Sequence, residues 1–174
     1  KAISDPGKLL HMVEPFGLNE DNGSSGVDDR TGVGTKRKGS SVSALTIAYY
    51  EKTGVPVVGV SCSKGGSSTT FWMPGTKPLN DAIARQLAAE QWLADNGYTI
   101  RNNYMFWLQG ESDALKATSE GDYLRMLKEY KDALKRDVGI DAFTIIRVGY
   151  FSKDHALDEA IMRAQERAAA DDSD

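Results

Sequence analysis

The spacing of apolar residues predicts two helices in the C-terminal half of the chain. In the first, four apolar side chains recur at i, i+4, i+7 and i+11, which is one face of a helix. These residues are Tyr123, Leu127, Tyr130 and Leu134. A second helical stripe consists of Leu157, Ile161, Ala164 and Ala168. We therefore expect a helix over 120–137 and a final helix through the second stripe.

Two earlier helices are predicted where start and stop signals flank an apolar period. The first begins at Ser40 or Ser41, either of which is a good N-cap, and ends at Gly54. The second begins after Asn80 and ends at Gly97.

Three short runs rich in β-branched and aromatic residues predict strands, and the first two are expected to be buried. They cover 55–62, 103–108 and 142–149. Because strands alternate with helices, we expect an α/β protein with a parallel sheet covered on both faces, a three-layer sandwich. No internal repeat or linker divides the sequence, so residues 1–174 are expected to form a single domain.

The segment 20–41 has neither a helical nor a strand period and is rich in glycine, serine and charge. A stretch of this length without structure is unusual inside a compact domain. A functional surface loop and a flexible insertion both remain open as interpretations.

Composition narrows the classes of function. Hydrophobic residues make up 40% of the 174 residues and charged residues 26%, which is typical of a globular protein. The net charge of -4 argues against a nucleic-acid or anionic-membrane surface, and no apolar run is long enough for a membrane helix. One cysteine, Cys62, and two histidines leave little for a disulfide framework or a metal site. We expect no metal and no organic cofactor.

Two motifs follow predicted strands, and ligands bind at the carboxyl ends of strands in an open parallel sheet. The first motif, Ser63–Ser68, contains Gly65 and Gly66. Paired glycines leave backbone N–H groups uncovered, which suits an oxyanion or a phosphate. The phosphate hypothesis is weaker, because neither glycine-rich nucleotide-binding pattern occurs. A simple tight turn is the competing interpretation.

The second motif is Gln109–Asp113, with the sequence QGESD. Gln109 offers an amide donor, and Glu111 and Asp113 offer carboxylates. Taken alone, the motif favours the simpler interpretation, a loop with a capping acid. Paired acids are also used by glycosidases, although spacing in sequence does not fix the distance between them. Nearby aromatic residues, Trp107 and Trp72, suit either sugar stacking or the core.

No nucleophile stands out in the sequence. No Gly-x-Ser-x-Gly elbow occurs, and Cys62 is expected to be a small buried apolar residue. His155 is expected to be a solvated histidine of a loop or a helix start, and His11 is interpreted in the same way. The turn serines are individually weak candidates, and they are Ser61, Ser63, Ser67 and Ser68.

Taken together, the two motifs resemble the SGNH hydrolase superfamily, and more narrowly its branch of sialate O-acetylesterases and acetylxylan esterase-like proteins. The specific part is Trp-x-Gln-Gly-Glu-Ser-Asp at 107–113, which follows Cys-x-x-Gly-Gly-Ser-Ser at 62–68. Val13-Glu14-Pro15 and Arg163-Ala164-Gln165 also fall where that branch has similar residues. The resemblance covers most of the chain. It implies a flavodoxin-like α/β fold, present in incomplete form, and a serine hydrolase that removes acetyl groups from an acetylated carbohydrate.

The resemblance also implies roles for individual residues. Gly66, or Gly65, resembles the family's backbone oxyanion donor, and Gln109 resembles its amide side-chain donor. Glu111 and Asp113 resemble residues that shape the site. The expected substrate-binding residues are Gly65, Ser67, Trp72, Glu111 and Asp113.

The family's Gly-Gln-Ser-Asn block, which carries the nucleophile, and its Asp-x-x-His block do not occur in residues 1–174. The resemblance thus implies the middle of an esterase, with nucleophile and base before Lys1 and after Asp174. Lys1 is not an initiator methionine and begins no signal-peptide pattern, which agrees with a trimmed or processed chain. The alternative hypothesis is a non-catalytic carbohydrate-binding or interaction domain.

Overall fold

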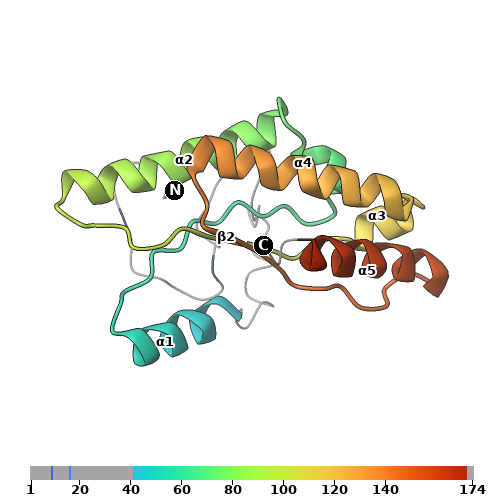
Figure 1. Ribbon diagram of the computed structural model, residues 1–174, viewed down its shortest axis with the longest axis horizontal. Helices are drawn as coiled ribbons and strands as arrows, with labels where there is room; N and C mark the ends of the chain where they lie inside the picture. Colours follow the sequence, from blue (N-terminus) through green and yellow to red (C-terminus); the bar gives the residue numbers. More distant parts are fainter. Residues whose placement is uncertain (1–8, 10–15, 17–40, 172–174) are drawn as a thin grey trace, which may run out of the picture. The chain divides into compact units, whose positions relative to one another are not determined.

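The computed structural model describes Leu9, Phe16 and residues 41–171 (Figure 1). They belong to two compact units. The described parts of unit 1 are Leu9, Phe16, 41–65 and 84–99, and those of unit 2 are 66–83 and 100–171. The loop predicted over 20–41 falls outside the described residues, except for Ser41.

Unit 1 contains helix α1, Ser41–Thr53, which confirms the first predicted helix. The helix ends where predicted, at Gly54, whose φ of +68° is a left-handed conformation that glycine adopts without strain. Residues 55–62 were expected to be a buried strand, and this prediction was wrong. They lie in no strand, and Val57 and Val58 are exposed. A strand needs a hydrogen-bonded neighbour, and the described sheet pairs only two other segments.

Helix α2, Lys77–Asp95, confirms a predicted helix but starts earlier than expected. Asn80 is not its cap, because the Asn80 N–H donates to the carbonyl of Thr76 at 3.1 Å, as it does inside a helix. The Thr76 hydroxyl, 3.4 Å from the Leu79 N–H, takes the capping position instead. The predicted stop at Gly97 is confirmed by its φ of +79°.

Two parallel strands form the sheet of unit 2. Strand β1, Tyr104–Trp107, pairs with β2, Ala142–Ile145, in a register that joins Tyr104 to Ala142 and Trp107 to Ile145. This confirms an α/β protein with a parallel sheet, although both strands are shorter than predicted. The expected burial of β1 holds for one face only, since Trp107 is buried whereas Tyr104 and Phe106 are each 44% exposed.

Helix α4, Glu120–Val138, covers the buried face of this sheet. Its predicted stripe is confirmed, since Tyr123, Leu127, Tyr130 and Leu134 are all buried. The Tyr130 ring lies 4.5 Å from the Trp107 ring and 5.9 Å from the Phe143 ring, which locks the helix to both strands. The Ser119 hydroxyl accepts from the Asp122 N–H and caps the first turn.

Short helix α3, Glu111–Leu115, and helix α5, His155–Ala170, complete this unit with the 3₁₀ turn η2, Thr69–Trp72. Helix α5 confirms the predicted final helix and packs against α3 and α4 (Figure 1). Two arginines of α5, Arg163 and Arg167, each contact a Glu120 carboxylate oxygen at 2.9 Å. Such exposed pairs add little stability, so the apolar contacts decide the packing.

Gly121 lies within α4 and Gly139 follows its last residue, so the two glycines allow a matched pair of substitutions. Gly139 has a φ of +61°, Gly121 lies in the helix, and an added Cβ would meet nothing within 4 Å at either position. We expect Gly139→Ala to lower the free energy of unfolding by about 1 kcal/mol, because Cβ is strained at positive φ. Gly121→Ala should raise it by about 0.5–1 kcal/mol, through the unfolded chain. Urea unfolding followed by circular dichroism measures both, and shifts of the same sign would contradict the prediction.

Candidate functional site

The structure brings the glycine turn and the QGESD motif together within unit 2. The Gln109 side-chain amide donates from Nε2 to the carbonyl oxygen of Ser67 at 3.1 Å. The Asp113 carboxylate accepts from the N–H of Thr69 at 2.7 Å. Residues 40 or more positions apart in sequence are therefore joined by direct hydrogen bonds.

Gly66 begins the turn side of this site. It has a φ of +72°, is exposed, and has nothing within 4 Å of a notional Cβ. Among the described residues, no acceptor lies within hydrogen-bonding range of its N–H. Gly66 thus presents an unshielded donor, as the sequence suggested. Gly65 belongs to unit 1 and is also exposed.

Gln109 lies at the centre of the site and is only 8% exposed. Its Nε2 donates both to Ser67 and to the Asp113 carboxylate, whereas its Oε1 accepts from the Thr69 hydroxyl at 3.0 Å. The Tyr123 hydroxyl lies 3.2 Å from the same oxygen. Because Ser67 and Asp113 offer only acceptors here and the Thr69 hydroxyl offers a donor, the amide has one orientation that satisfies these three neighbours.

Asp113 is fully buried and holds the Gln109 amide in this arrangement. Its Oδ2 accepts from Gln109 and from the Thr69 N–H, and its Oδ1 accepts from the Thr118 hydroxyl at 3.2 Å. The Thr69 hydroxyl lies 3.1 Å from Oδ2, and its single proton is shared between Oδ2 and Gln109 Oε1. A buried carboxylate is tolerated only when it is hydrogen-bonded this fully. Asp113 therefore ties η2 to the QGESD segment.

Trp72 and Ser67 fix the shape of the turn. The Trp72 indole N–H donates to the Ser67 hydroxyl at 2.9 Å, and Trp72 is only 3% exposed. Its ring packs edge-on against Trp107 at 6.5 Å. In this arrangement Trp72 is a core residue and offers no open face to a sugar, whereas Ser67 is half-buried.

The QGESD motif forms a strand end followed by α3, a helix that the sequence did not predict. Gly110 makes the change of direction with a φ of +155°. A Cβ there would lie 2.8 Å from Ile161 Cγ2 and 3.1 Å from both Val148 methyl carbons. Glycine is therefore required twice, for its conformation and for its missing side chain. Glu111 is half-buried in the first turn of α3.

Three buried residues of the network were missed as polar site residues: Thr69, Tyr123 and Gln165. Tyr123 was noticed only as part of an apolar stripe, and Gln165 only as part of a resemblance. Gln165 is 1% exposed and donates to the Gln109 carbonyl at 2.7 Å. Gln165 lies four residues after Ile161 and next to Ala164, which both belong to the apolar face of α5. This position was the available sign that its amide points inward.

Burial raises the pKa of the Tyr123 phenol to about 12. Hydrogen bonds from Trp107 and Gln165 act in the opposite direction but are weaker than the desolvation. Tyr123 therefore keeps its proton and donates toward Gln109, whose carbonyl oxygen lies 2.8 Å away.

The other candidate nucleophiles and bases form no serine–histidine pair in the described part of the chain. His155 is exposed at the start of α5, as expected, and stacks on Tyr150 at 4.4 Å. No hydrogen bond joins it to a serine hydroxyl in residues 41–171. Cys62 is half-buried, so it is less enclosed than predicted. Ser68 is buried, and its hydroxyl contacts Lys116 Nζ at 2.8 Å.

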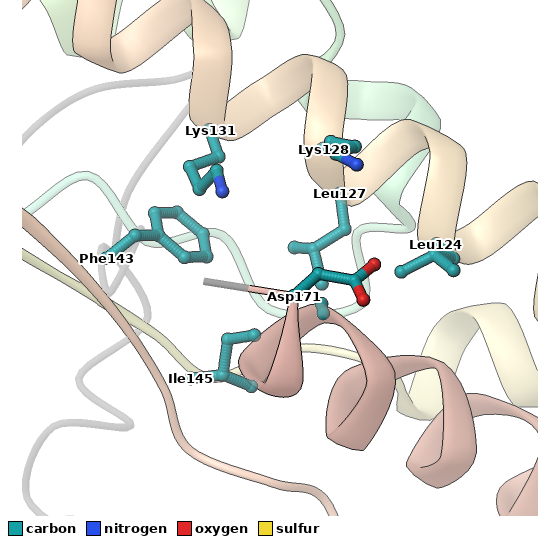
Figure 2. A pocket seen from close by; sticks show the side chains of 8 residues that line it. Leu124, Leu127, Lys128, Lys131, Phe143, Ile145 and Asp171 are labelled. Carbon is teal, nitrogen blue, oxygen red and sulfur yellow. The ribbon is translucent and has the colours of Figure 1, made fainter. Parts of the chain in front are cut away.

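A separate small cavity lies between α4, β2 and the end of α5 (Figure 2). Its volume is about 20 Å³, room for one water molecule. Leu127, Phe143 and Ile145 give it an apolar lining, with Lys128 and Asp171 at its rim. None of the network residues lines it, so it is not part of the site.

The part of the chain that the structure describes lacks both a membrane-spanning helix and a metal-binding cluster. No helix in that part is long and apolar enough to cross a membrane. The same residues contain no group of three or more histidine, cysteine or acidic side chains that could hold a metal ion.

Comparison with known proteins identifies the family of this chain. A family model described as carbohydrate esterase, sialic acid-specific acetylesterase, matches residues 15–173. The chain belongs to this family. The resemblance to sialate O-acetylesterases is thereby confirmed, and the prediction of a carbohydrate esterase holds at the level of the family. No curated protein and no solved structure matches the chain significantly.

In this member of the esterase family, a substitution at Gly110 tests how tightly the residues around the site are packed. We expect Gly110→Ala to lower the free energy of unfolding by about 3 kcal/mol, since overpacking and backbone strain both oppose it. Gly149→Ala is the control, because Gly149 has no positive φ and nothing within 4 Å of its Cβ position. Thermal and urea unfolding compare them, and a loss for Gly110→Ala no larger than the control's would contradict the packing described.

Proposed function

We propose that the chain acts in the removal of O-acetyl groups from carbohydrates, by the serine-hydrolase route. The observation that carries the proposal is the hydrogen bond from Gln109 Nε2 to the Ser67 carbonyl at 3.1 Å. It places a side-chain amide donor beside the turn that exposes the Gly66 N–H. Family membership supports the same chemistry in its coarser form, a carbohydrate esterase.

The Ser67 carbonyl oxygen marks where an acyl oxygen would bind. Effective oxyanion donors lie about 2.7–3.1 Å from the developing negative charge. One N–H of Gln109 is held by the charged Asp113, and the other is held only by the neutral Ser67 carbonyl. The second bond is the weaker one. We therefore propose that the acetyl oxygen of the substrate replaces Ser67 as the acceptor of that N–H.

The proposed reaction uses these donors in its first step. A serine oxygen attacks the acetyl carbon, its proton passes to a histidine, and the carbonyl electron pair moves onto the acyl oxygen. Gln109 and the Gly66 N–H stabilise that oxyanion. When the oxyanion collapses, the bond from the acyl carbon to the sugar oxygen breaks, and that oxygen takes the proton from the histidine. Water then hydrolyses the acetyl-serine and releases acetate. The serine and histidine are not assigned to residues of this chain.

The remaining candidate residues divide by their exposure. Asp113 and Trp72 are buried, so we propose that they shape the site through Gln109 and Ser67. Ser67, Glu111 and Gly65 are half-buried or exposed, which leaves them available to the sugar. No metal or organic cofactor takes part in the proposed reaction.

A non-catalytic carbohydrate-binding domain is the second candidate. It is favoured by one observation, that residues 41–171 contain no serine hydroxyl bonded to histidine. The two candidates differ in whether a fluorophosphonate probe attaches covalently, which intact mass measures. An adduct together with acetate release supports the esterase, whereas sugar binding with neither supports the binding domain.

Gln109→Ala tests the proposed oxyanion donor. We expect kcat for acetate release from an O-acetylated sugar to fall about 10²–10³-fold, because one preorganised donor is lost. Circular dichroism and thermal unfolding show whether the variant is folded. Gln91→Ala is the matched control, since Gln91 is exposed on α2 and contacts only Asp95 among the described residues.

The control should retain wild-type kcat. A decrease of less than threefold for a folded Gln109→Ala protein would remove Gln109 from the oxyanion site.

A further inference from the structure

Gln165 on α5 is buried, yet it contributes no apolar group to the core. It is 1% exposed, and its Oε1 accepts from the Val148 N–H at 3.0 Å. Its Nε2 donates to the Gln109 carbonyl at 2.7 Å and to the Tyr123 hydroxyl at 3.1 Å. Because Val148 offers only a donor and the Gln109 carbonyl only an acceptor, the Gln165 amide has one satisfying orientation. A leucine or methionine would fill this space without the cost of burying an amide.

The Gln109 carbonyl explains why an amide is needed at this place. Gly110, with its φ of +155°, turns the chain out of β1. No backbone N–H among the described residues reaches the Gln109 carbonyl, and side chains of Gln165 and Tyr123 supply the donors instead. A buried carbonyl left without a donor would be costly. These two side chains therefore fix the Gln109 peptide.

The Tyr123 hydroxyl contacts both oxygens of Gln109, the carbonyl oxygen at 2.8 Å and the side-chain Oε1 at 3.2 Å. Its single proton goes to the nearer carbonyl oxygen, so at Oε1 the phenol limits the space of the side chain without adding a second hydrogen bond. With the phenol and the Thr69 hydroxyl at the oxygen end, the Nε2 end is directed toward Ser67 and Asp113. Errors of about 1 Å in donor placement can cost up to about 100-fold in rate.

We propose that Gln165, acting with Tyr123, is a positioning residue that aims the Gln109 amide at the acyl oxygen. The inference rests on the proposed function for its catalytic consequence, but the orientation of Gln109 can be measured without any substrate. Gln165 itself touches neither substrate nor reacting atoms in this scheme.

The test combines a spectroscopic and a kinetic measurement on Gln165→Met, with Tyr123→Phe as a second variant that removes a single hydroxyl. The side-chain NH₂ signal of Gln109 is identified by its loss in Gln109→Ala. We expect hydrogen exchange of that NH₂ to accelerate at least tenfold in both variants. We expect kcat for acetate release to fall about 10–100-fold with KM unchanged.

A double-mutant cycle separates positioning from a general structural effect. Gln165→Met should have no further effect on kcat when Gln109 is already alanine. Leu134→Val is the control, because Leu134 is buried on α4 and forms none of the bonds of the network. It should lower the unfolding temperature while leaving Gln109 exchange and kcat as in wild type.

Each result decides the inference. Unchanged Gln109 exchange in folded Gln165→Met and Tyr123→Phe overturns it, and so does a kcat loss that adds fully to that of Gln109→Ala. If Gln109→Ala leaves kcat unchanged, the proposed function fails, and Gln109 exchange alone then decides whether Gln165 positions the amide.

Discussion

The buried amide of Gln109 is the interaction on which the organisation of unit 2 depends. Its oxygen end accepts a hydrogen bond from η2 and contacts the Tyr123 hydroxyl of α4, and its nitrogen end donates to the turn and to α3. Such a group is costly unless every partner is present, so the elements that supply the partners must assemble together. The aromatic contact between Trp107 and Tyr130 belongs to the apolar core of the same unit, and the polar network then selects one arrangement of that core.

The network also accounts for features that look unrelated in sequence. Gly110 must be glycine because its neighbours Ile161 and Val148 occupy the space of a Cβ. Its turn removes the Gln109 carbonyl from the strand ladder, which in turn requires Gln165. Asp113 is buried because Thr69 and Gln109 both need an acceptor there. Gln165 and Asp113 each supply a hydrogen bond that a neighbouring buried group would otherwise lack.

Local sequence predicted the elements whose stability is local or amphipathic. Helix α4 followed from the stripe through Tyr123 and Leu134, and it ends at Val138, one residue beyond the predicted end. The strand predicted over 55–62 was wrong because a strand also depends on a hydrogen-bonded partner from elsewhere in the chain. The valines of this segment fit a sheet, but no described strand pairs with them. For the site, the motifs indicated Gly66, Gln109 and Asp113, whereas Thr69 and Gln165 are joined to them only by tertiary contacts across 40 or more residues.

The hydrogen bond from Gln109 to the Ser67 carbonyl has a consequence for the proposed catalysis. A buried amide N–H without an acceptor is costly, and the Ser67 carbonyl removes that cost by accepting one N–H of Gln109. A neutral ester oxygen that replaced Ser67 would gain little, since one neutral acceptor is exchanged for another. An oxyanion would gain much more, because hydrogen bonds to charged acceptors are about twice as strong. The displaced carbonyl thereby makes the proposed site bind the transition state in preference to the ground state, which is the condition for accelerating the reaction.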